Sequence, residues 1–526
     1  MKPVYKDTRL LDERARKLYA LTEDIMMENA AAALQKEIES YLTKNAMDIN
    51  KVIILCGSGN NGADGYALAR RMSGKEKFFA PQKYLEVTAC TVLEPKSQMC
   101  VLQKMRAQKT GVKIVSEKKL LSDNKEFFAN DISRIIFVDC IFGTGFHGDV
   151  PQKAAALIAK VNSIPSYRIA CDLPTGIDLD GIVSQNAFIA DTTITMGAQK
   201  FCMFTDDAKD FVGKVKDADL GIQHELFCPS VTGDASLQPE FYLLEESDCK
   251  LPLRKKQNVN KGNFGHTAVV GGIKTGAAVI ASCASLKFGS GLATIVSNES
   301  EKEILIPAEL MVSKEFPANT TAAAIGMGLG RSNPLTADYL KFLDEHKDIS
   351  CVLDADIFYY KELKSFLKKQ VKAKRTNIVL TPHPKEFVEL IKNCLEEEYK
   401  ALNLEQLPVK EQIKLVVKNR HPLVKKFCST FPGILLLLKG ANVLIGQKLS
   451  GKNADVKIYV NANGTNALSK AGSGDILAGI TAGLLAQKYS ASDAAVTATL
   501  SLGKTAQKFV SFEATPFEIL ARVTKN

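Results

Sequence analysis

The feature that most constrains the fold is an alternation of short apolar runs with helical segments, in which several of the runs end in glycine-rich loops. An amphipathic helix is expected over residues 18–34, and another helical pattern covers 152–161. This alternation is typical of a parallel sheet covered by helices. The strands expected in the first part of the chain are 51–56, 85–93, 134–140, 168–173 and 192–196.

The alternation breaks between residues 226 and 262, where Pro229, Gly233, Pro239 and Pro252 fall close together, and then it restarts. We therefore expect two α/β domains in series, with boundaries at 1–225 and 245–526 and a linker over 226–244. The strands expected after the break are 267–271, 293–297, 351–354, 378–380, 434–438 and 457–460, and the helices are 277–288, 334–344, 385–391 and 475–487.

Composition excludes two broad classes of protein. A chain with 46% hydrophobic and 24% charged residues is not disordered, and 526 residues are enough for two to four domains. No run of about 18 apolar residues suggests a membrane span, and the first residues lack the apolar core of a signal peptide. The sequence is therefore expected to be a cytoplasmic protein that does not enter a membrane.

Cysteine, histidine and basic residues give no sign of a zinc site or of nucleic-acid binding. The 12 cysteines are scattered singly, and those in strand-like runs (Cys56, Cys140, Cys171, Cys351) are expected to be buried thiols. The six histidines form no HExxH motif. The formal charge of +10 is spread along the chain, and the densest basic stretch, 368–375, is expected to be one solvated helix face. Such a mild excess suits an anionic small molecule such as a nucleotide.

The first glycine loop, GSGNNGADG at 57–65, follows the first strand and precedes a helix expected from Tyr66. Its glycines match the dinucleotide fingerprint GxGxxG only loosely. Asp64 would bring a carboxylate to the helix end that should receive phosphate, and no ribose-binding acid follows about 20 residues on. A plain glycine turn with Asp64 as a helix acid is the alternative. Two amides and a carboxylate among four glycines favour a ligand site.

Two further strands end in similar chemistry. The strand closing at Asp139 leads to Gly143–Gly148, and the strand before Asp172 leads to Pro174-Thr175-Gly176. Ligands of parallel α/β sheets bind beyond the carboxyl ends of the strands. Asn61, Asp139 and Thr175 could supply oxygen ligands to a monovalent cation, and Asp172 could serve as acid or base. Each acid alone could be a cap or turn former, but the three loops together favour a site.

In this order and spacing, GSGNNGADG, VDCIFGTG and DLPTGID resemble the YjeF N-terminal family, the NAD(P)H-hydrate epimerases, over about residues 1–225, together with the early EDIMMENAA segment. The resemblance implies a Rossmann-like α/β/α sandwich, potassium held by Asn61, Asp139 and Thr175, and Asp172 as the acid/base residue. Ala63 replaces the usual glycine, and Thr175 replaces serine but keeps the hydroxyl. The implied substrate contacts are Asn60, Asn61, Gly62, Ala63, Asp64, Gly143, Thr144, Gly145, Phe146, His147, Gly148, Asp149 and Asp172.

In the second half, AGSGDILAGI at 471–480 places glycines before a helix that starts near Asp475. Backbone N–H groups at such a helix start can stabilise a phosphoryl group, and an aspartate there can take a proton from an attacking hydroxyl. A glycine turn followed by a capped helix is the alternative. The segment resembles the GAGD element of ribokinase-like kinases.

Four other elements accompany it: a strand and glycine loop at 267–277, a glycine turn at 326–330, LTPHPKE around His383, and LKGANV around Lys439. A lone histidine is often structural, but the setting between two prolines favours a ligand contact for His383. Lys439 could meet a phosphate or simply lie exposed at a strand end.

Together the five elements resemble the YjeF C-terminal family, the ADP- or ATP-dependent NAD(P)H-hydrate dehydratases, over about residues 245–526. The resemblance implies a ribokinase-like α/β domain that uses Mg²⁺ with ADP or ATP. Lys470 stands where many members carry a Met-Ala-Thr-Gly-type run, which leaves the detail of the phosphate loop open. The implied substrate contacts are Ala277, Gly328, His383 and Asp475, and the implied nucleotide contacts are Lys439, Gly440, Ala441, Asn442, Val443 and Gly474.

The expected function is the repair of hydrated NADH and NADPH (NADHX and NADPHX), by epimerisation of the R and S forms and dehydration of the S form at the expense of ADP or ATP. The products would be NAD(P)H, AMP or ADP, and phosphate; the fused chain favours ADP. A homo-oligomer is expected, with no nucleic-acid partner. A small-molecule kinase and a non-catalytic nucleotide sensor are the alternatives. The sensor is disfavoured because binding alone requires neither Asp172 nor Asp475.

Overall fold

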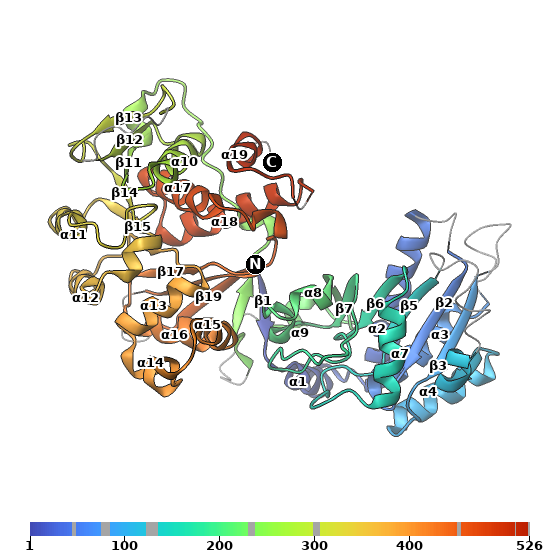
Figure 1. Ribbon diagram of the computed structural model, residues 1–526. Helices are drawn as coiled ribbons and strands as arrows, with labels where there is room; N and C mark the ends of the chain where they lie inside the picture. Colours follow the sequence, from blue (N-terminus) through green and yellow to red (C-terminus); the bar gives the residue numbers. More distant parts are fainter. Residues whose placement is uncertain are drawn as a thin grey trace. The chain divides into compact units, whose positions relative to one another are not determined.

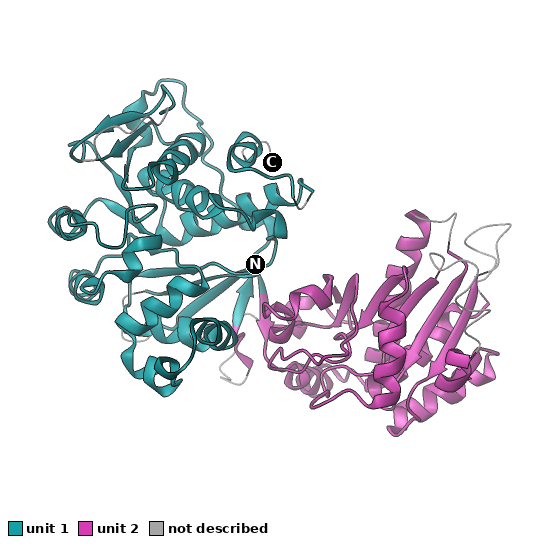
Figure 2. Cartoon of the chain, in the orientation of Figure 1, with its two compact units in different colours: residues 1–2, 241–526 teal, residues 3–240 magenta. Residues whose placement is uncertain are grey.

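The protein forms two compact units, residues 3–240 and residues 1–2 with 241–526 (Figure 2). The division lies inside the segment 226–244 that the sequence analysis assigns as a linker. Short elements stand at both ends of that segment, α9 (His224–Phe227) and β10 (Phe241–Leu243). The computed structural model describes residues 1–44, 49–74, 85–122, 135–229, 237–297, 306–449, 454–510 and 512–523, so 230–236 of the segment lie outside the described residues.

The unit 3–240 contains a parallel sheet in the order β4-β3-β2-β5-β6-β7-β9 (Figure 1). A short parallel pair, β1 (Lys2–Tyr5) with β8 (Gln199–Lys200), lies outside this sheet. The sheet strands are β2 (Lys51–Cys56), β3 (Glu86–Thr91), β4 (Lys113–Ser116), β5 (Ile135–Cys140), β6 (Tyr167–Cys171), β7 (Thr192–Met196) and β9 (Lys214–Ala218). The helices are α1 (Arg9–Tyr19), α2 (Glu23–Lys44), α3 (Asn60–Met72), α4 (Gln98–Lys109), α5 (Glu117–Ser122), α7 (Gln152–Asn162) and α8 (Lys209–Val212).

Both faces of this sheet are buried, which explains why its strands are apolar throughout. In β2, Val52 and Ile54 pack with α1 to α4 on one face, whereas Ile53 and Leu55 pack with α5 and α7 on the other. The same alternation of period two runs along β5. The result is the expected sandwich of helices, sheet and helices.

The helix expected over 18–34 is wrong, because the chain forms two helices there. Helix α1 ends at Tyr19, the next residue, Ala20, adopts a left-handed conformation with φ 53°, and α2 begins at Glu23. The left-handed residue stops the helix and turns the chain, so that α1 and α2 can both pack on the sheet. Leu11 of α1 and Leu34 of α2 are in the same core.

The other unit is built on a sheet in the order β13-β12-β11-β14-β15-β16-β17-β18-β19-β10 (Figure 1). Neighbouring strands from β13 to β17 are parallel, and β18 is antiparallel to β17 and to β19. The strands besides β10 are β11 (His266–Val270), β12 (Leu292–Val296), β13 (Met311–Ser313), β14 (Ala322–Ile325), β15 (Ser350–Leu353), β16 (Ile378–Leu380), β17 (Leu435–Leu438), β18 (Val443–Lys448) and β19 (Val456–Asn461).

The core of this unit joins the sheet to the helices α10, α17, α18 and α19. Helix α17 is buried along almost its whole length, because small residues let it lie against α10: a Cβ at Gly479 would come within 2.1 Å of the Ala281 carbonyl oxygen. The helices are α10 (Thr275–Lys287), α11 (Thr336–Glu345), α12 (Leu363–Lys372), α13 (Pro384–Cys394), α14 (Glu396–Ala401), α15 (Val409–Lys418), α16 (Arg420–Thr430), α17 (Ser473–Ala486), α18 (Ala491–Ala506) and α19 (Pro516–Arg522).

The expectation of one solvated basic face over 368–375 is wrong for its last residue. The lysines at 368, 369, 372 and 374 are exposed, but Arg375 is buried. Its guanidinium donates to the carbonyl oxygens of Leu343 and Ile349, which supply the partners that a buried cation needs.

Two further expectations concern burial. The thiols of Cys56, Cys140, Cys171 and Cys351 are free and buried, as predicted. Across the described parts of the chain, no helix combines the length and the apolar character that a membrane crossing requires.

Candidate active sites

In the unit 3–240, three of the predicted site residues converge at the carboxyl ends of the neighbouring strands β2, β5 and β6. A Cβ placed on Gly143 would lie 2.8 Å from Asp172 Oδ2 and 3.4 Å from Asn61 Oδ1. A side chain at this position would displace the Asp172 carboxylate. The loops that together were expected to form a site therefore do lie side by side.

The residues Asn60–Asp64 lie on a helix and not in the expected loop, because α3 begins at Asn60. The glycines explain the difference. A Cβ on Gly62 would lie 2.1 Å from the carbonyl oxygen of Gly57, the residue that follows β2. The backbone after β2 can therefore lie this close to α3 only because position 62 is glycine. Gly62 is therefore a packing glycine in a helix, and Asn61 and Asp64 are held on the first turns of a rigid element.

Asp172 is the most constrained residue of this site. It has φ 68°, a conformation that non-glycine residues rarely adopt and that tends to persist at functional sites. Its Oδ2 accepts hydrogen bonds from Thr144 N (3.0 Å) and Thr144 Oγ1 (2.5 Å), and its Oδ1 accepts one from Met196 N (3.3 Å). Lys200 Nζ lies 2.7 Å from Oδ1.

Lys200 was not predicted as a site residue. Its side chain is fully buried, and it also donates to Thr195 Oγ1 at 2.8 Å. Although burial raises the pKa of Asp172, Lys200 and the hydrogen bonds outweigh this effect and hold that pKa below its usual value. Asp172 is therefore ionised at neutral pH. The one signal in the sequence is a lysine four residues beyond the expected strand 192–196 and directly before the apolar run Phe201–Phe204.

Asp139 and Thr175, two predicted cation ligands, are in direct contact. Thr175 N donates to Asp139 Oδ2 at 2.7 Å, and Thr175 Oγ1 donates to Oδ1 at 2.8 Å. Burial raises the pKa of Asp139 to about 6, although these hydrogen bonds oppose the rise. The third predicted ligand, Asn61, has a buried amide whose oxygen and nitrogen have no hydrogen-bond partner. A buried carboxyl that has hydrogen bonds but no counter-charge, next to a buried amide oxygen without a hydrogen-bond partner, suits a cation.

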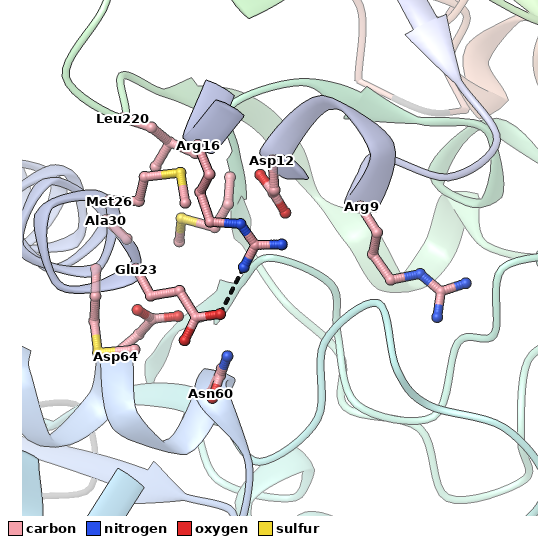
Figure 3. A pocket seen from close by; sticks show the side chains of 11 residues that line it. Arg9, Asp12, Arg16, Glu23, Met26, Ala30, Asn60, Asp64 and Leu220 are labelled. Carbon is pink, nitrogen blue, oxygen red and sulfur yellow. Dashed lines mark hydrogen bonds and ion pairs between the residues drawn. The ribbon is translucent and has the colours of Figure 1, made fainter. Parts of the chain in front are cut away.

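A pocket of about 310 Å³ opens beside the start of α3 (Figure 3). Asn60 and Asp64 line it, as predicted for substrate-binding residues. Burial, with the nearby charge of Asp172, raises the pKa of Asp64 well above its usual value. The remaining lining residues were not predicted: Arg9, Asp12, Arg16, Glu23, Met26, Met27, Ala30, Met196 and Leu220.

The predicted segment Gly143–Asp149 is only partly in this site. Thr144 binds Asp172, and Phe146 is buried against Phe142. Gly145, His147, Gly148 and Asp149 are exposed, and no residue of the segment is among those that line the pocket. The structure gives Gly62 and Ala63 buried positions in α3 behind Asn61.

In the unit 241–526, the predicted residues again lie beyond the carboxyl ends of parallel strands. The loops after β11 and β14 interlock: Lys274 N donates to the Gly328 carbonyl oxygen at 3.0 Å, and Gly328 has φ 62°. A Cβ on Gly328 would lie 2.5 Å from the Lys274 carbonyl oxygen. Ala277 lies in the first turn of α10, directly after this contact.

His383 has a structural role as a helix cap, and its contact with a ligand stays a prediction. Its Nδ1 accepts from the N–H groups of Lys385 and Glu386 and caps α13. Its Nε2 lies 3.1 Å from Glu386 Oε1, and the imidazole is 45% exposed, so it remains accessible to a ligand. Burial and the nearby Lys439 lower the pKa of His383, so the ring is neutral at pH 7.

Lys439 is not an exposed residue at a strand end. Its Nζ lies 2.9 Å from Asp354 Oδ1 and 3.8 Å from Glu386 Oε2. A Cβ on Gly474 would lie 3.3 Å from the same nitrogen, so the start of α17 comes directly against it. Asp354 and Glu386 were not predicted as site residues. Their signals were the aspartate that closes the 351–354 strand and the glutamate of LTPHPKE.

Asp475 lies in the first turn of α17, behind Gly472 with φ 94°. Burial and the charge of Asp354 raise its pKa to about 6, although Lys439 opposes the rise. Asp475 and Lys439 therefore occupy one electrostatic cluster. Lys470, the departure noted in the sequence, donates from Nζ to the Phe512 carbonyl oxygen.

The rest of the predicted nucleotide segment follows Lys439. Gly440 and Ala441 are exposed, Asn442 is buried, and Val443 begins β18. The Asn442 carbonyl oxygen accepts from Arg420 at 3.0 Å, which fixes the turn.

Comparison with known proteins matches both units. A family model described as "YjeF-related protein N-terminus" matches residues 23–202, and one described as "NAD(P)H-hydrate dehydratase" matches residues 267–521. The bifunctional NAD(P)H-hydrate repair enzyme Nnr of Helicobacter pylori is 37% identical over 526 residues, 99% of each chain. The enzyme of the same name from Moorella thermoacetica is 28% identical and covers 91% of this chain and 86% of its own.

Among solved structures, the ADP/ATP-dependent NAD(P)H-hydrate dehydratase from Bacillus subtilis, co-crystallised with ATP and Mg²⁺, is 22% identical to this chain. It covers 52% of this chain and 93% of its own length with a TM-score of 0.39.

Proposed function

The chain belongs to the family of bifunctional NAD(P)H-hydrate repair enzymes, and from this premise we propose which residues carry its two activities. One observation carries the proposal. In each unit an aspartate at the carboxyl edge of the sheet is in the electrostatic field of a lysine, Asp172 with the buried Lys200 and Asp475 with the half-buried Lys439. Perturbed acids of this kind, in loops that glycines hold together, are typical of catalytic sites.

The unit 3–240 epimerises NADHX and NADPHX, the hydrated forms of NADH and NADPH. Asn60 and Asp64 bind the nucleotide in the pocket beside α3. Asp172 is the ionised base that accepts the proton of the substrate hydroxyl, and Thr144 and Lys200 hold its carboxylate in place. The exposed loop from Gly145 to Asp149 covers the remainder of the substrate.

Asn61, Asp139 and Thr175 hold a potassium ion in this unit. The orphaned amide oxygen of Asn61 and the buried carboxyl of Asp139 support this assignment. When bound, the ion supplies positive charge beside the strand ends and keeps Asp139 ionised.

The unit 241–526 dehydrates the S epimer at the expense of ADP or ATP. Hydroxide is a poor leaving group, so the hydroxyl must be phosphorylated before it leaves. Asp475 takes the hydroxyl proton as the oxygen attacks the terminal phosphoryl group. Phosphate then leaves with the C–O electron pair, and loss of a proton from the adjacent carbon restores the ring double bond. The products are NAD(P)H, phosphate, and AMP or ADP.

The other predicted residues of this unit position the two ligands. Lys439 exchanges its contact with Asp354 for the transferred phosphoryl group, and the N–H groups at the start of α17 bind the phosphate oxygens. His383, Ala277 and Gly328 contact the hydrated ring. Residues 440–443 and Gly474 contact the nucleotide.

Magnesium accompanies the nucleotide. No group of three or more His, Cys, Asp or Glu side chains that could hold a metal occurs among the described residues. This fits an ion bound mainly by phosphates, with Asp354 and Glu386 as the protein carboxylates beside it. The ion supplies charge neutralisation for the phosphoryl group.

We further propose a cytoplasmic homo-oligomer. The cysteines are all free thiols, as expected in a reducing compartment. Leu10, Leu18 and Ile25 on α1 and α2 are at least 40% exposed, which suits a contact between copies. Light scattering of the purified chain checks the oligomeric state.

The experiment that tests the proposed function uses a mixture of R- and S-NADHX with protein, Mg²⁺, K⁺ and either ADP or ATP. Reduced nicotinamide is followed by absorbance, and the remaining epimers are separated by chromatography. Conversion of both epimers with one nucleotide, ADP by preference, is expected. A stable phosphorylated product would instead indicate a kinase, and binding without turnover would indicate a sensor.

A further inference from the structure

The pocket beside α3 has a wall that the predicted site residues do not account for. Helix α1 contributes Arg9, Asp12 and Arg16 to it (Figure 3). These residues precede the stretch 23–202 that the family model matches, so the comparison gives them no role. Arg16 is already bound to Glu23 of α2 at 2.6 Å, and Arg9 is bound to Asp7.

Asp12 differs from its neighbours on α1 because its carboxylate makes no hydrogen bond and no ion pair with any described residue. Asp12 lines the same pocket as Asp64, which belongs to α3. Met196, whose N–H donates to Asp172 Oδ1, is also part of this wall. Asp12 is therefore open to a bound substrate near Asp172.

Charged groups from every neighbouring element act on Asp12. Arg16 lies on α1 itself and Asp7 lies just before this helix, whereas Lys200 and Asp172 act from the ends of strands. Arg9, Glu23 and Asp64 share the pocket. Burial dominates and raises the pKa of Asp12 to about 6, with Asp172 adding to the rise and Lys200 opposing it.

We propose that Asp12 is a second catalytic acid/base residue of the epimerase and acts together with Asp172. This inference rests on the proposed function of the unit. It goes beyond that function because it adds a residue outside the matched family segment and gives the reaction a proton donor.

The chemistry of the substrate requires such a donor. Water adds to an enamine with its hydroxyl on the carbon next to nitrogen, so the hydrated carbon carries both a nitrogen and a hydroxyl. Asp172 takes the hydroxyl proton, the O–H electron pair forms C=O, and the C–N pair passes to the ring nitrogen. That nitrogen takes a proton from Asp12. The carbonyl group then rotates so that its other face meets the ring nitrogen, which attacks the carbonyl carbon again. Asp12 takes back the proton from the nitrogen, and Asp172 returns its proton to the oxygen.

The two carboxyl groups are suited to opposite tasks. Lys200 and three hydrogen bonds keep Asp172 ionised, whereas Asp12 has no partner and binds a proton more readily. Of the other acids in the pocket, Glu23 is paired with Arg16, and Asp64 is buried within α3 with Cys171 Sγ 3.9 Å from its Oδ2. Asp64 binds the nucleotide, and Asp12 exchanges its proton.

The pH dependence follows from these roles. A proton donor must be protonated, so kcat/KM for epimerisation falls as the pH rises through the pKa of Asp12, about 6. Asp172 has a lowered pKa and limits the rate only in stronger acid.

The test compares Asp12→Asn and Asp12→Glu with Glu13→Gln in the full-length chain, with uncatalysed epimerisation subtracted. Glu13 is the adjacent residue of α1, is 46% exposed and pairs with Lys17. We expect Asp12→Asn to lower kcat by at least about 100-fold and to abolish the alkaline decline. Asp12→Glu should retain activity with the decline at a shifted pH, and Glu13→Gln should match the wild type. Thermal unfolding followed by circular dichroism compares the folding of the variants with that of the wild type, because dehydratase activity would report only on the unit 241–526.

Two results would overturn the inference. One is an Asp12→Asn variant with kcat within about threefold of the wild type. The other is an alkaline decline that persists unchanged in Asp12→Asn or Asp12→Glu. If the wild type itself does not epimerise NADHX, the proposed function of the unit fails, which is a different outcome from an active Asp12→Asn variant.

Discussion

Lys200 shows how a single residue connects packing with chemistry in the unit 3–240. Its ammonium is fully buried, and a buried cation is tolerated only when paired and hydrogen-bonded. Asp172, Thr195 and the Ala198 carbonyl oxygen supply those partners. The same contacts fix the position and the charge of Asp172. Removing the lysine should therefore affect stability and activity together.

We predict that Lys200→Met lowers the free energy of unfolding by about 3–5 kcal/mol, because it leaves the Asp172 carboxylate buried without a counter-charge. Lys6→Met is the matched control, since Lys6 and Asp180 form an exposed pair at 2.9 Å. That control should cost less than about 1 kcal/mol. Urea denaturation of the two variants checks the difference, and equal losses would contradict the role of Lys200.

The deficit of Lys200→Met should also depend on pH. In the wild type the folded-state pKa of Asp172 is lowered, so the pair stabilises the fold above the ordinary pKa of 3.8 and the effect is lost as pH falls. Without the lysine, burial raises the folded-state pKa instead. The variant should then approach the wild type as the pH falls below about 4 and differ from it most at neutral pH.

At the second site we predict that Asp475→Asn abolishes regeneration of NAD(P)H and leaves epimerisation unchanged. The pKa of Asp475 is raised to about 6, so the base is ionised above that pH and the dehydratase rate of the wild type should rise as pH increases through 6. Removing a partly buried charge should not lower the free energy of unfolding. A variant that loses activity because it unfolds would contradict the chemical role.

Sequence reasoning found the residues that precede or follow a strand, because glycine loops mark such positions. Asn61, Asp139, Asp172 and Thr175 were predicted in this way, although their roles remain predictions. Lys200, Asp354 and Glu386 were missed. Their local signals are weak, and their roles become clear only from tertiary contacts, such as that between Lys439 and Asp354, which are 85 residues apart. No local pattern reports such a contact.

At the level of elements, helix α3 is the part of the fold on which the first site depends most. We predict that Gly62→Ala lowers the free energy of unfolding by about 1–3 kcal/mol and abolishes epimerisation, because the added Cβ would lie 2.1 Å from the Gly57 carbonyl oxygen. Gly59→Ala is the matched control, since nothing lies within 4 Å of a Cβ there. Thermal unfolding and the epimerase assay check both variants. Equal behaviour would show that α3 is not held by this contact.

Elements with a strong apolar pattern were predicted within a few residues, as for β2, β5 and β17. The pattern was insufficient where an element depends on packing. Strand β14 was missed because alanine is uncommon in strands, although β14 lies between β11 and β15 in the sheet. The early start of α3 was missed because glycines suggest a loop until their close backbone contacts are known.

At the level of the whole molecule, each unit contains its own set of candidate catalytic residues. Asp12, Asp64, Asp172 and Lys200 belong to the unit 3–240, and the Asp475 cluster belongs to the other. Neither set requires a described residue from the other unit. One chain can thus act on both epimers, because the first unit converts the epimer that the second cannot use.

This division predicts that two damaged chains complement each other. Asp172→Asn alone should leave the R epimer unrepaired, and Asp475→Asn alone should leave both unrepaired. In an equimolar mixture the S epimer made by Asp475→Asn chains reaches the intact dehydratase of Asp172→Asn chains by diffusion. We expect both epimers of NADHX to be converted at a rate within about a factor of two of the wild type at equal site concentration, measured by chromatography. A mixture that fails while each variant keeps its remaining activity would show that the intermediate must pass between the sites of one assembly.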